Sequence, residues 1–230
     1  MTGRPRGRSV AAMFSKVIVG PGGDALALAE TLAPDAELVR SGARSLMREA
    51  AAEGADLIVV GLLRADFQEL LDWPPCPVAI APAGYRGMPR TLRLVGVGFD
   101  GSPAALSALA IAQAVARDAA AEVHLRVVAE PRARDFDLDG RELEAGGLLR
   151  RTLRAAAAVP TDGDVVVGQP QQALQALSMQ VDLLVCGTHG WRGCFERLIP
   201  GSTAEWLAHH AGCPVVVTPL AAARETALAG

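Results

Sequence analysis

The chain is poor in the features that mark several common classes of protein. Aromatic residues make up 4% of its 230 residues, which disfavours a surface that stacks nucleic-acid bases. Its net charge is −3 at pH 7, so the composition gives no electrostatic attraction for a nucleic acid. No apolar run in the sequence reaches the roughly 18 residues that a bilayer span needs. We therefore expect neither a nucleic acid nor a membrane as a partner.

Cysteine is also scarce. The four cysteines are Cys76, Cys186, Cys194 and Cys213. None of them forms a CxxC pair, which disfavours a zinc ribbon or a redox motif, and no HExxH spacing for a metal occurs. Near the N-terminus the apolar stretch is broken by Ser15 and Lys16, unlike a secretory signal. A reduced, cytoplasmic setting is the simpler expectation, with Cys186 as a small buried hydrophobe.

Two parts of the chain repeat the same segments in the same order. Residues 56–61 resemble 182–187, and residues 76–82 resemble 213–219. The first copy is shorter, because 14 residues separate Gly61 from Cys76, whereas 25 separate Gly187 from Cys213. The sequence therefore predicts a duplicated unit whose first copy is truncated.

Short β-rich runs alternate with helical patterns through both copies. This alternation predicts an α/β fold with two doubly wound parallel sheets, one in residues 14–83 and one in residues 91–220. The expected strands are 16–20, 36–40, 56–61, 77–81, 92–99, 122–129, 164–168, 181–187 and 214–218. The expected helices are 24–33, 43–53, 65–71, 103–119, 140–157, 170–179 and 202–211.

Glycine and hydroxyl residues follow the predicted strand 181–187. Four glycines fall within 15 residues, and Ser202 and Thr203 then open a helix. These glycines are Gly187, Gly190, Gly193 and Gly201. Backbone N–H groups of such a loop, together with a helix N-terminus, are suited to bind an anion.

A second candidate segment ends the predicted strand 92–99. Asp100, Gly101 and Ser102 come at the edge of the sheet where parallel α/β folds bind ligands. Ser102, followed by Pro103, is a good N-cap for the next helix. That leaves Asp100 to accept a hydrogen bond from an amine or hydroxyl of a ligand, while its charge would repel a phosphate.

Two other interpretations of these residues are open. Residues 96–101 match GxGxxG, the dinucleotide fingerprint, but Gly96 and Gly98 alternate within an apolar run and so belong to the strand. His189 could serve as a catalytic base, although no Ser or Cys partner is indicated. No GxxxxGK sequence occurs, so a P-loop is excluded.

Taken together, the residues resemble the signature of the universal stress protein family. That signature is a strand ending in Asp-Gly-Ser, then Gly-x2-Gly-x9-Gly-Ser/Thr after the fourth strand, then Cys-Pro-Val. Here these are residues 100–102, 187–203 and 213–215. The resemblance covers residues 91–220 as a full domain and residues 14–83 as a degenerate one. It implies a Rossmann-like fold of the adenine nucleotide alpha-hydrolase type.

The resemblance also implies a ligand and a pairing. Members that bind ATP hold adenine near residues that correspond to Asp100 and Val127, and hold ribose and phosphates on the glycine loop. The expected nucleotide-binding set is Asp100, Gly101, Ser102, Val127, Gly187, His189, Gly190, Arg192, Gly193, Gly201, Ser202 and Thr203. ATP, with or without Mg²⁺, is the implied cofactor of a stress-response sensor or regulator that is not an enzyme. Pairing through the last strands implies contact of 77–81 with 214–218 within the chain, and leaves a homodimer open.

The loop departs from the family pattern in one respect. Ten residues, rather than nine, separate Gly190 from Gly201, and Pro200 brings no N–H group. Arg192 and Gly193 could compensate, with the arginine as a cation for phosphates. A nucleotide-independent interaction module and a slow ATPase are therefore the alternatives.

Overall fold

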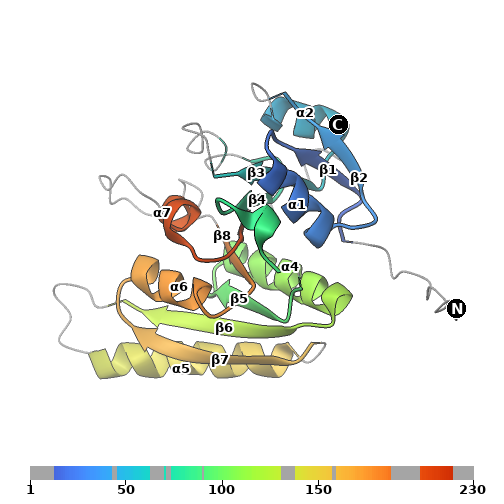
Figure 1. Ribbon diagram of the computed structural model, residues 1–230. Helices are drawn as coiled ribbons and strands as arrows, with labels where there is room; N and C mark the ends of the chain where they lie inside the picture. The colour runs from blue at the N-terminus through green and yellow to red at the C-terminus, as the bar shows by residue number, and fades with distance from the viewer. Residues whose placement is uncertain are drawn as a thin grey trace, which may run out of the picture.

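The computed structural model describes residues 13–42, 46–62, 70, 74–89, 91–130, 138–156, 159–187 and 203–219. Their strands are β1 (Lys16–Val19), β2 (Glu37–Arg40), β3 (Leu57–Gly61), β4 (Val78–Ala81), β5 (Leu94–Gly98), β6 (Glu122–Ala129), β7 (Thr161–Val167), β8 (Leu183–Gly187) and β9 (Val215–Thr218). They form one sheet in the order β2-β1-β3-β4-β9-β8-β5-β6-β7 (Figure 1). The predicted α/β fold is confirmed, but the two parallel sheets that the sequence predicts are joined into one mostly parallel sheet.

The sheet consists of two parallel parts that meet at its centre. Strands β1 to β4 are parallel to one another, and so are β5 to β9. Between them β4 pairs antiparallel with β9, with Val78 opposite Val217 and Ile80 opposite Val215. Because the direction reverses at this pair, the carboxyl ends of the two sets of strands point to opposite edges of the sheet.

Helices cover both faces of the sheet. They are α1 (Gly23–Leu32), α2 (Leu46–Glu53), α4 (Pro103–Ala119), α5 (Leu138–Ala155), α6 (Pro170–Ser178) and α7 (Thr203–His210), with a short 3-10 turn, η1 (Tyr85–Gly87). One hydrophobic core joins α1, α4 and α5 to the sheet, and another joins α2, α6 and α7. Figure 1 shows α5 and α6 on opposite sides of β6 and β7. Each core includes strands of both parallel parts, so the two parts share their packing.

Two glycines inside β5 are required by the packing of a helix. A Cβ atom built on Gly98 would lie 2.7 Å from Cδ1 of Leu174 in α6, and one on Gly96 would lie 3.1 Å from Leu177 and Val181. Both glycines lie within the strand, as the apolar alternation predicted. They do not form a turn that could hold a diphosphate, which argues against the dinucleotide interpretation.

The predicted elements agree with the structure apart from their ends. The largest difference is β7, which begins at Thr161 rather than at residue 164. Asp and Gly are weak strand formers, but pairing of Thr161 with Val123 and of Asp162 with His124 extends the strand. The expected helix 65–71 lies outside the described residues, except for residue 70.

Candidate functional site

The candidate site lies where the strand order reverses in the second parallel part. From β5 the chain moves outward to β6 and then β7, and then crosses back to β8 on the other side of β5. The connections after β5 and after β8 therefore leave in different directions from neighbouring strand ends. Such a point is where open α/β sheets form a crevice for a ligand.

The connection after β5 is a tight turn built by Asp100, Gly101 and Ser102. Oδ1 of Asp100 accepts a hydrogen bond from the N–H of Ser102 at 2.9 Å. Gly101 has a φ of 80°, a conformation that L side chains rarely adopt. Ser102 caps α4, since its Oγ accepts from the N–H of Ala105 at 3.1 Å. The predicted N-cap is confirmed. The hydrogen bond between Asp100 and Ser102 was not predicted, and it holds the carboxylate of Asp100 at the N-terminus of α4.

Val127 lies on β6, the strand next to this turn. The two strands are joined where Phe99 donates its N–H to the carbonyl of Arg126 at 3.0 Å. The side chain of Val127 is 3% exposed and belongs to the core beneath α4 and α5. Val127 thus belongs to the buried apolar packing of the strand that neighbours the Asp100 turn.

Gly187 ends β8 on the other side of β5. A Cβ atom at this position would lie 2.7 Å from the carbonyl carbon of Ala104, in the first turn of α4. Thr218, opposite Gly187 in β9, donates its buried hydroxyl towards the carbonyls of Ala104 and Cys186, at 3.2 and 3.3 Å. The end of β8 and the start of α4 are therefore held together.

The glycine loop is described only at its two ends. Gly187 closes β8, and Thr203 begins α7. The predicted site residues His189, Gly190, Arg192, Gly193, Gly201 and Ser202 lie outside the described residues. Of the predicted site residues, the structure brings together Asp100, Gly101, Ser102, Val127 and Gly187. It also describes α7, the helix that begins with Thr203 after the loop.

Cys186 is a structural residue next to this loop. Burial raises the pKa of its thiol to about 12, and does the same for Cys213. Thiolate is the reactive form of cysteine, so neither side chain is suited to act as a nucleophile at neutral pH.

A charged network on β6 and β7 is not among the residues that the sequence singled out. Arg126 is buried, with 7% of the residue exposed. Its guanidinium donates to both carboxylate oxygens of Asp164 at 2.9 and 2.6 Å and to the carbonyl of Ala173 in α6 at 3.2 Å. His124 lies 2.7 Å from Asp162 and 3.4 Å from Asp164. Hydrogen bonding to Arg126 lowers the pKa of Asp164. The sequence could have indicated this network, because His124 and Arg126 alternate with the apolar residues Val123, Leu125 and Val127.

The two parallel parts of the sheet contain corresponding bonds made by an aspartate. Oδ2 of Asp182, just before β8, accepts the N–H groups of Arg93 and Leu94 at 2.7 and 3.0 Å. Oδ2 of Asp56, just before β3, accepts those of Ser15 and Lys16 at 3.0 and 3.2 Å. Asp182 thus ties β8 to β5, and Asp56 ties β3 to β1.

The part of the chain that the structure describes offers no cluster of side chains for a metal ion. It contains no group of three or more His, Cys, Asp or Glu side chains placed to hold a metal ion. None of its helices combines the length and apolar character needed to cross a membrane.

The chain matches one protein family, and two solved structures resemble its fold over most of its length. The model of the universal stress protein family matches residues 91–219, more than half of the chain. The structure of a functionally unknown protein from Pseudomonas aeruginosa PAO1 is similar, with a TM-score of 0.68 and 17% identity, over 94% of this chain and 98% of that one. A universal stress protein from Archaeoglobus fulgidus DSM 4304 has a TM-score of 0.63 and 16% identity, over 89% of this chain and 96% of that one. At such identities the two structures establish the shared fold.

Proposed function

The chain belongs to the universal stress protein family, and on this premise we propose that its second unit binds an adenine nucleotide, with ATP as the first candidate. Binding would make the protein a sensor or regulator in a stress response rather than a catalyst. The site would lie at the carboxyl ends of β5, β6 and β8.

The observation that carries this proposal is the Asp100 turn at the strand-order reversal. Its carboxylate is exposed and is oriented by the N–H of Ser102. An oriented carboxylate favours a ligand group with N–H or O–H donors, which the adenine amine and the ribose hydroxyls both supply. The same carboxylate disfavours phosphate, so the base and sugar would lie at β5 and the phosphates at β8.

The phosphates would be held by the loop between β8 and α7. Gly187 brings the start of this loop against the first turn of α4. Thr203 opens α7, and a helix N-terminus contributes about 0.3–1 kcal/mol to a bound anion. A micromolar ligand requires about −8 kcal/mol, so Gly190, Gly201 and Ser202 would have to add several N–H and hydroxyl bonds. Mg²⁺ would then neutralise the remaining phosphate charge.

We also propose that residues 14–83 are a truncated copy of the same unit that acts as its pairing partner. The matching bonds of Asp56 and Asp182 support a common origin of the two copies. Gly61 also ends β3 as Gly187 ends β8, although its Cβ position lies 4.0 Å from the backbone N of Ala25 in α1, which leaves room for a side chain that Gly187 lacks. The antiparallel β4–β9 pair supplies the contact between the copies.

Isothermal titration of ATP with Mg²⁺ into the full chain tests the nucleotide proposal. We expect saturable binding that weakens about tenfold or more in Asp100→Ala, which removes the carboxylate that would accept from the ligand. Gly201→Val should weaken it similarly, because a β-branched side chain would obstruct the close approach of the loop backbone to the phosphates. Asp118→Ala, an exposed aspartate near the other end of α4, is the matched control. Absence of heat from folded protein at millimolar ATP would falsify the proposal.

The interaction-module alternative is favoured by one observation, the loop of ten residues that ends in Pro200. A proline before Gly201 removes one N–H donor and restrains the preceding residue. If the module is the function, partners captured by the chain will be the same with and without ATP. Phosphate release compared with Asp100→Ala, in the same samples, tests slow hydrolysis.

A further inference from the structure

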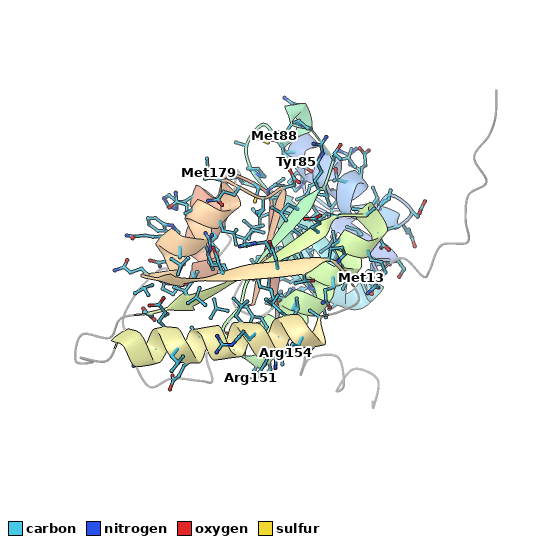
Figure 2. The ribbon with its side chains drawn as sticks, turned by 90° about the horizontal axis from the view of Figure 1, so that it is seen from below. Met13, Tyr85, Met88, Arg151, Arg154 and Met179 are labelled. Carbon is cyan, nitrogen blue, oxygen red and sulfur yellow. The ribbon has the colours of Figure 1, made fainter. Side chains whose placement is uncertain are left out.

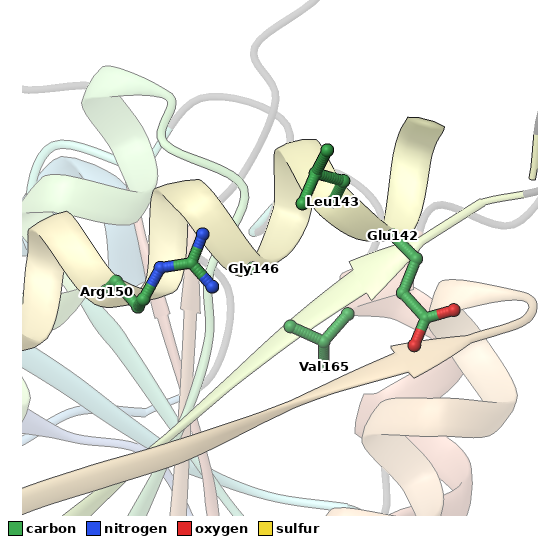
Figure 3. Close-up of a pocket in the computed structure, with 5 residues that line it drawn as sticks. All are labelled: Glu142, Leu143, Gly146, Arg150 and Val165. Carbon is green, nitrogen blue, oxygen red and sulfur yellow. The ribbon is translucent and has the colours of Figure 1, made fainter. Parts of the chain in front are cut away.

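Two hollows flank α5, each containing one arginine. One hollow, called the outer hollow, has a volume of about 390 Å³ and lies between α5 and the edge strand β7. It is lined by Glu142, Leu143, Gly146, Arg150 and Val165 (Figure 3). The hollow between α4 and α5 has a volume of about 300 Å³. Its lining comprises Phe99, Gly101, Leu106, Leu109, Gln113, Leu148, Arg151, Thr152, Ala155 and Ala156.

Each of these arginines lies beside the glycine four residues before it in α5. Nη1 of Arg150 lies 3.5 Å from the Cβ position of Gly146, and Nη1 of Arg151 lies 3.5 Å from that of Gly147. Glycine is less favourable than alanine inside a helix. Each guanidinium lies back along the helix within ordinary contact distance of its glycine, and the two arginines line different hollows. Figure 2 labels Arg151 on α5.

The two hollows differ in charge. The outer one contains Glu142 together with Arg150, so its lining carries both signs. Among the residues that the structure describes, the hollow between α4 and α5 has Arg151 as its charged residue, without an Asp or Glu in the lining. A ligand with a net negative charge is therefore matched by the second hollow and not by the first.

The remaining lining of the α4–α5 hollow is mostly apolar. Phe99 and Leu109 are buried, Leu148 is partly buried, and Leu106 is 54% exposed. Gln113 adds an amide, while the hydroxyl of Thr152 is already used by the carbonyl of Leu148 at 3.0 Å. Apolar walls with a few placed polar groups are the usual composition of a small-molecule site.

We propose that the hollow between α4 and α5 binds a small monocarboxylate with an apolar body. The carboxylate would pair with Arg151 and the amide of Gln113, and the body would cover Phe99, Leu109 and Leu148. The volume is about twice the ~150 Å³ of a cavity that admits benzene, which fits a ligand of about ten non-hydrogen atoms. Because Gly101 also lines the hollow, the ligand would lie against the Asp100 turn. The binding itself does not depend on a nucleotide.

The test uses phenylacetate, added to the ¹⁵N-labelled full chain without nucleotide and followed by NMR shifts. A ligand of this size is expected to bind with a Kd of around a millimolar. Arg151→Gln should weaken it about tenfold, as should replacing phenylacetate by the neutral phenylacetamide. Arg150→Gln, one residue away in the outer hollow, should leave the Kd unchanged.

A second variant tests the location of the site without changing Arg151. Ala155→Leu adds volume at an exposed helical position in the lining and should also weaken phenylacetate about tenfold, with the circular dichroism spectrum unchanged. The proposal is overturned if no saturable shift occurs at tens of millimolar phenylacetate. It is equally overturned if Arg150→Gln and Arg151→Gln lose the same affinity, or if phenylacetamide binds as well as phenylacetate.

Discussion

Gly187 lies so close to Ala104 that no side chain fits between them. A Cβ atom on Gly187 would lie 2.7 Å from both the carbonyl carbon and the Cβ atom of Ala104. Thr218 keeps the two segments in place through its hydrogen bonds to the carbonyls of Ala104 and Cys186. The loop after β8 therefore starts directly beside the helix that Ser102 caps, which brings the two connections of the candidate site together.

This contact predicts that Gly187→Ala destabilises the fold. The added methyl group meets backbone atoms that cannot turn away, and overpacking of this kind costs about 1–3 kcal/mol. Urea unfolding followed by circular dichroism measures the loss. Gly42→Ala is the control, because no atom of the described residues lies within 4 Å of its Cβ position. Equal stability of the two variants would show that α4 moves aside without cost.

The order of the strands and helices was predictable because it depends on local patterns. Apolar runs such as residues 183–186 and Pro103 after a serine are signals that the chain carries within a few residues. The cap made by Ser102 and the position of Gly96 and Gly98 inside β5 are confirmed for this reason.

Features that depend on partners distant in sequence were not predictable. Thr161, Asp162 and Gly163 form a strand only because β6 is there to pair with them. Arg126 is buried among apolar residues because Asp164, 38 positions later, neutralises it. In the candidate site, the sequence pointed to Asp100 but not to its bond with Ser102, which depends on the turn geometry that Gly101 allows.

The paired bonds of Asp56 and Asp182 predict that the two residues have the same structural role. Asp56→Ala and Asp182→Ala each remove an acceptor for two backbone N–H groups at the start of a strand. Each should lower the free energy of unfolding by about 1–2 kcal/mol, at the lower end for the more exposed Asp182. Thermal melts of both variants, with Asp118→Ala as an exposed control, measure this. A loss in one copy only would contradict the equivalence.

The ion pair of Arg126 with Asp164 predicts a stability that depends on pH. Hydrogen bonding to Arg126 lowers the pKa of Asp164 below its ordinary value of 3.8, so the pair stabilises the fold fully above that pH. As pH falls through the lowered pKa, the carboxylate is protonated and the stabilisation is lost. Asp164→Asn leaves Arg126 buried beside a neutral amide and should lower the free energy of unfolding by about 1–2 kcal/mol at pH 7. This loss is smaller than for a fully buried ion pair, because the side chain of Asp164 is 38% exposed.

Denaturant unfolding of the wild type and Asp164→Asn at several pH values checks this dependence. The difference between them should be constant from pH 7 to about pH 5 and should shrink below about pH 4. Asp162→Asn, whose side chain is 79% exposed, is the comparison and should change stability less. A difference that persists undiminished at pH 3 would mean that the charge of Asp164 is not what stabilises the pair.

The buried thiols predict slow reaction with disulfide reagents in the folded protein. Cys76, Cys186 and Cys213 are 2%, 5% and 6% exposed, and burial raises the pKa of the last two to about 12. At pH 8 only about one such thiol in ten thousand is the reactive thiolate. Because Cys194 lies outside the described residues, the measurement uses Cys194→Ala, so that the signal comes from these three thiols alone. Their labelling should follow the rate of unfolding, and all three should react at once in guanidinium. Rapid labelling of one thiol without denaturant would show that its part of the sheet opens well below the global free energy of unfolding.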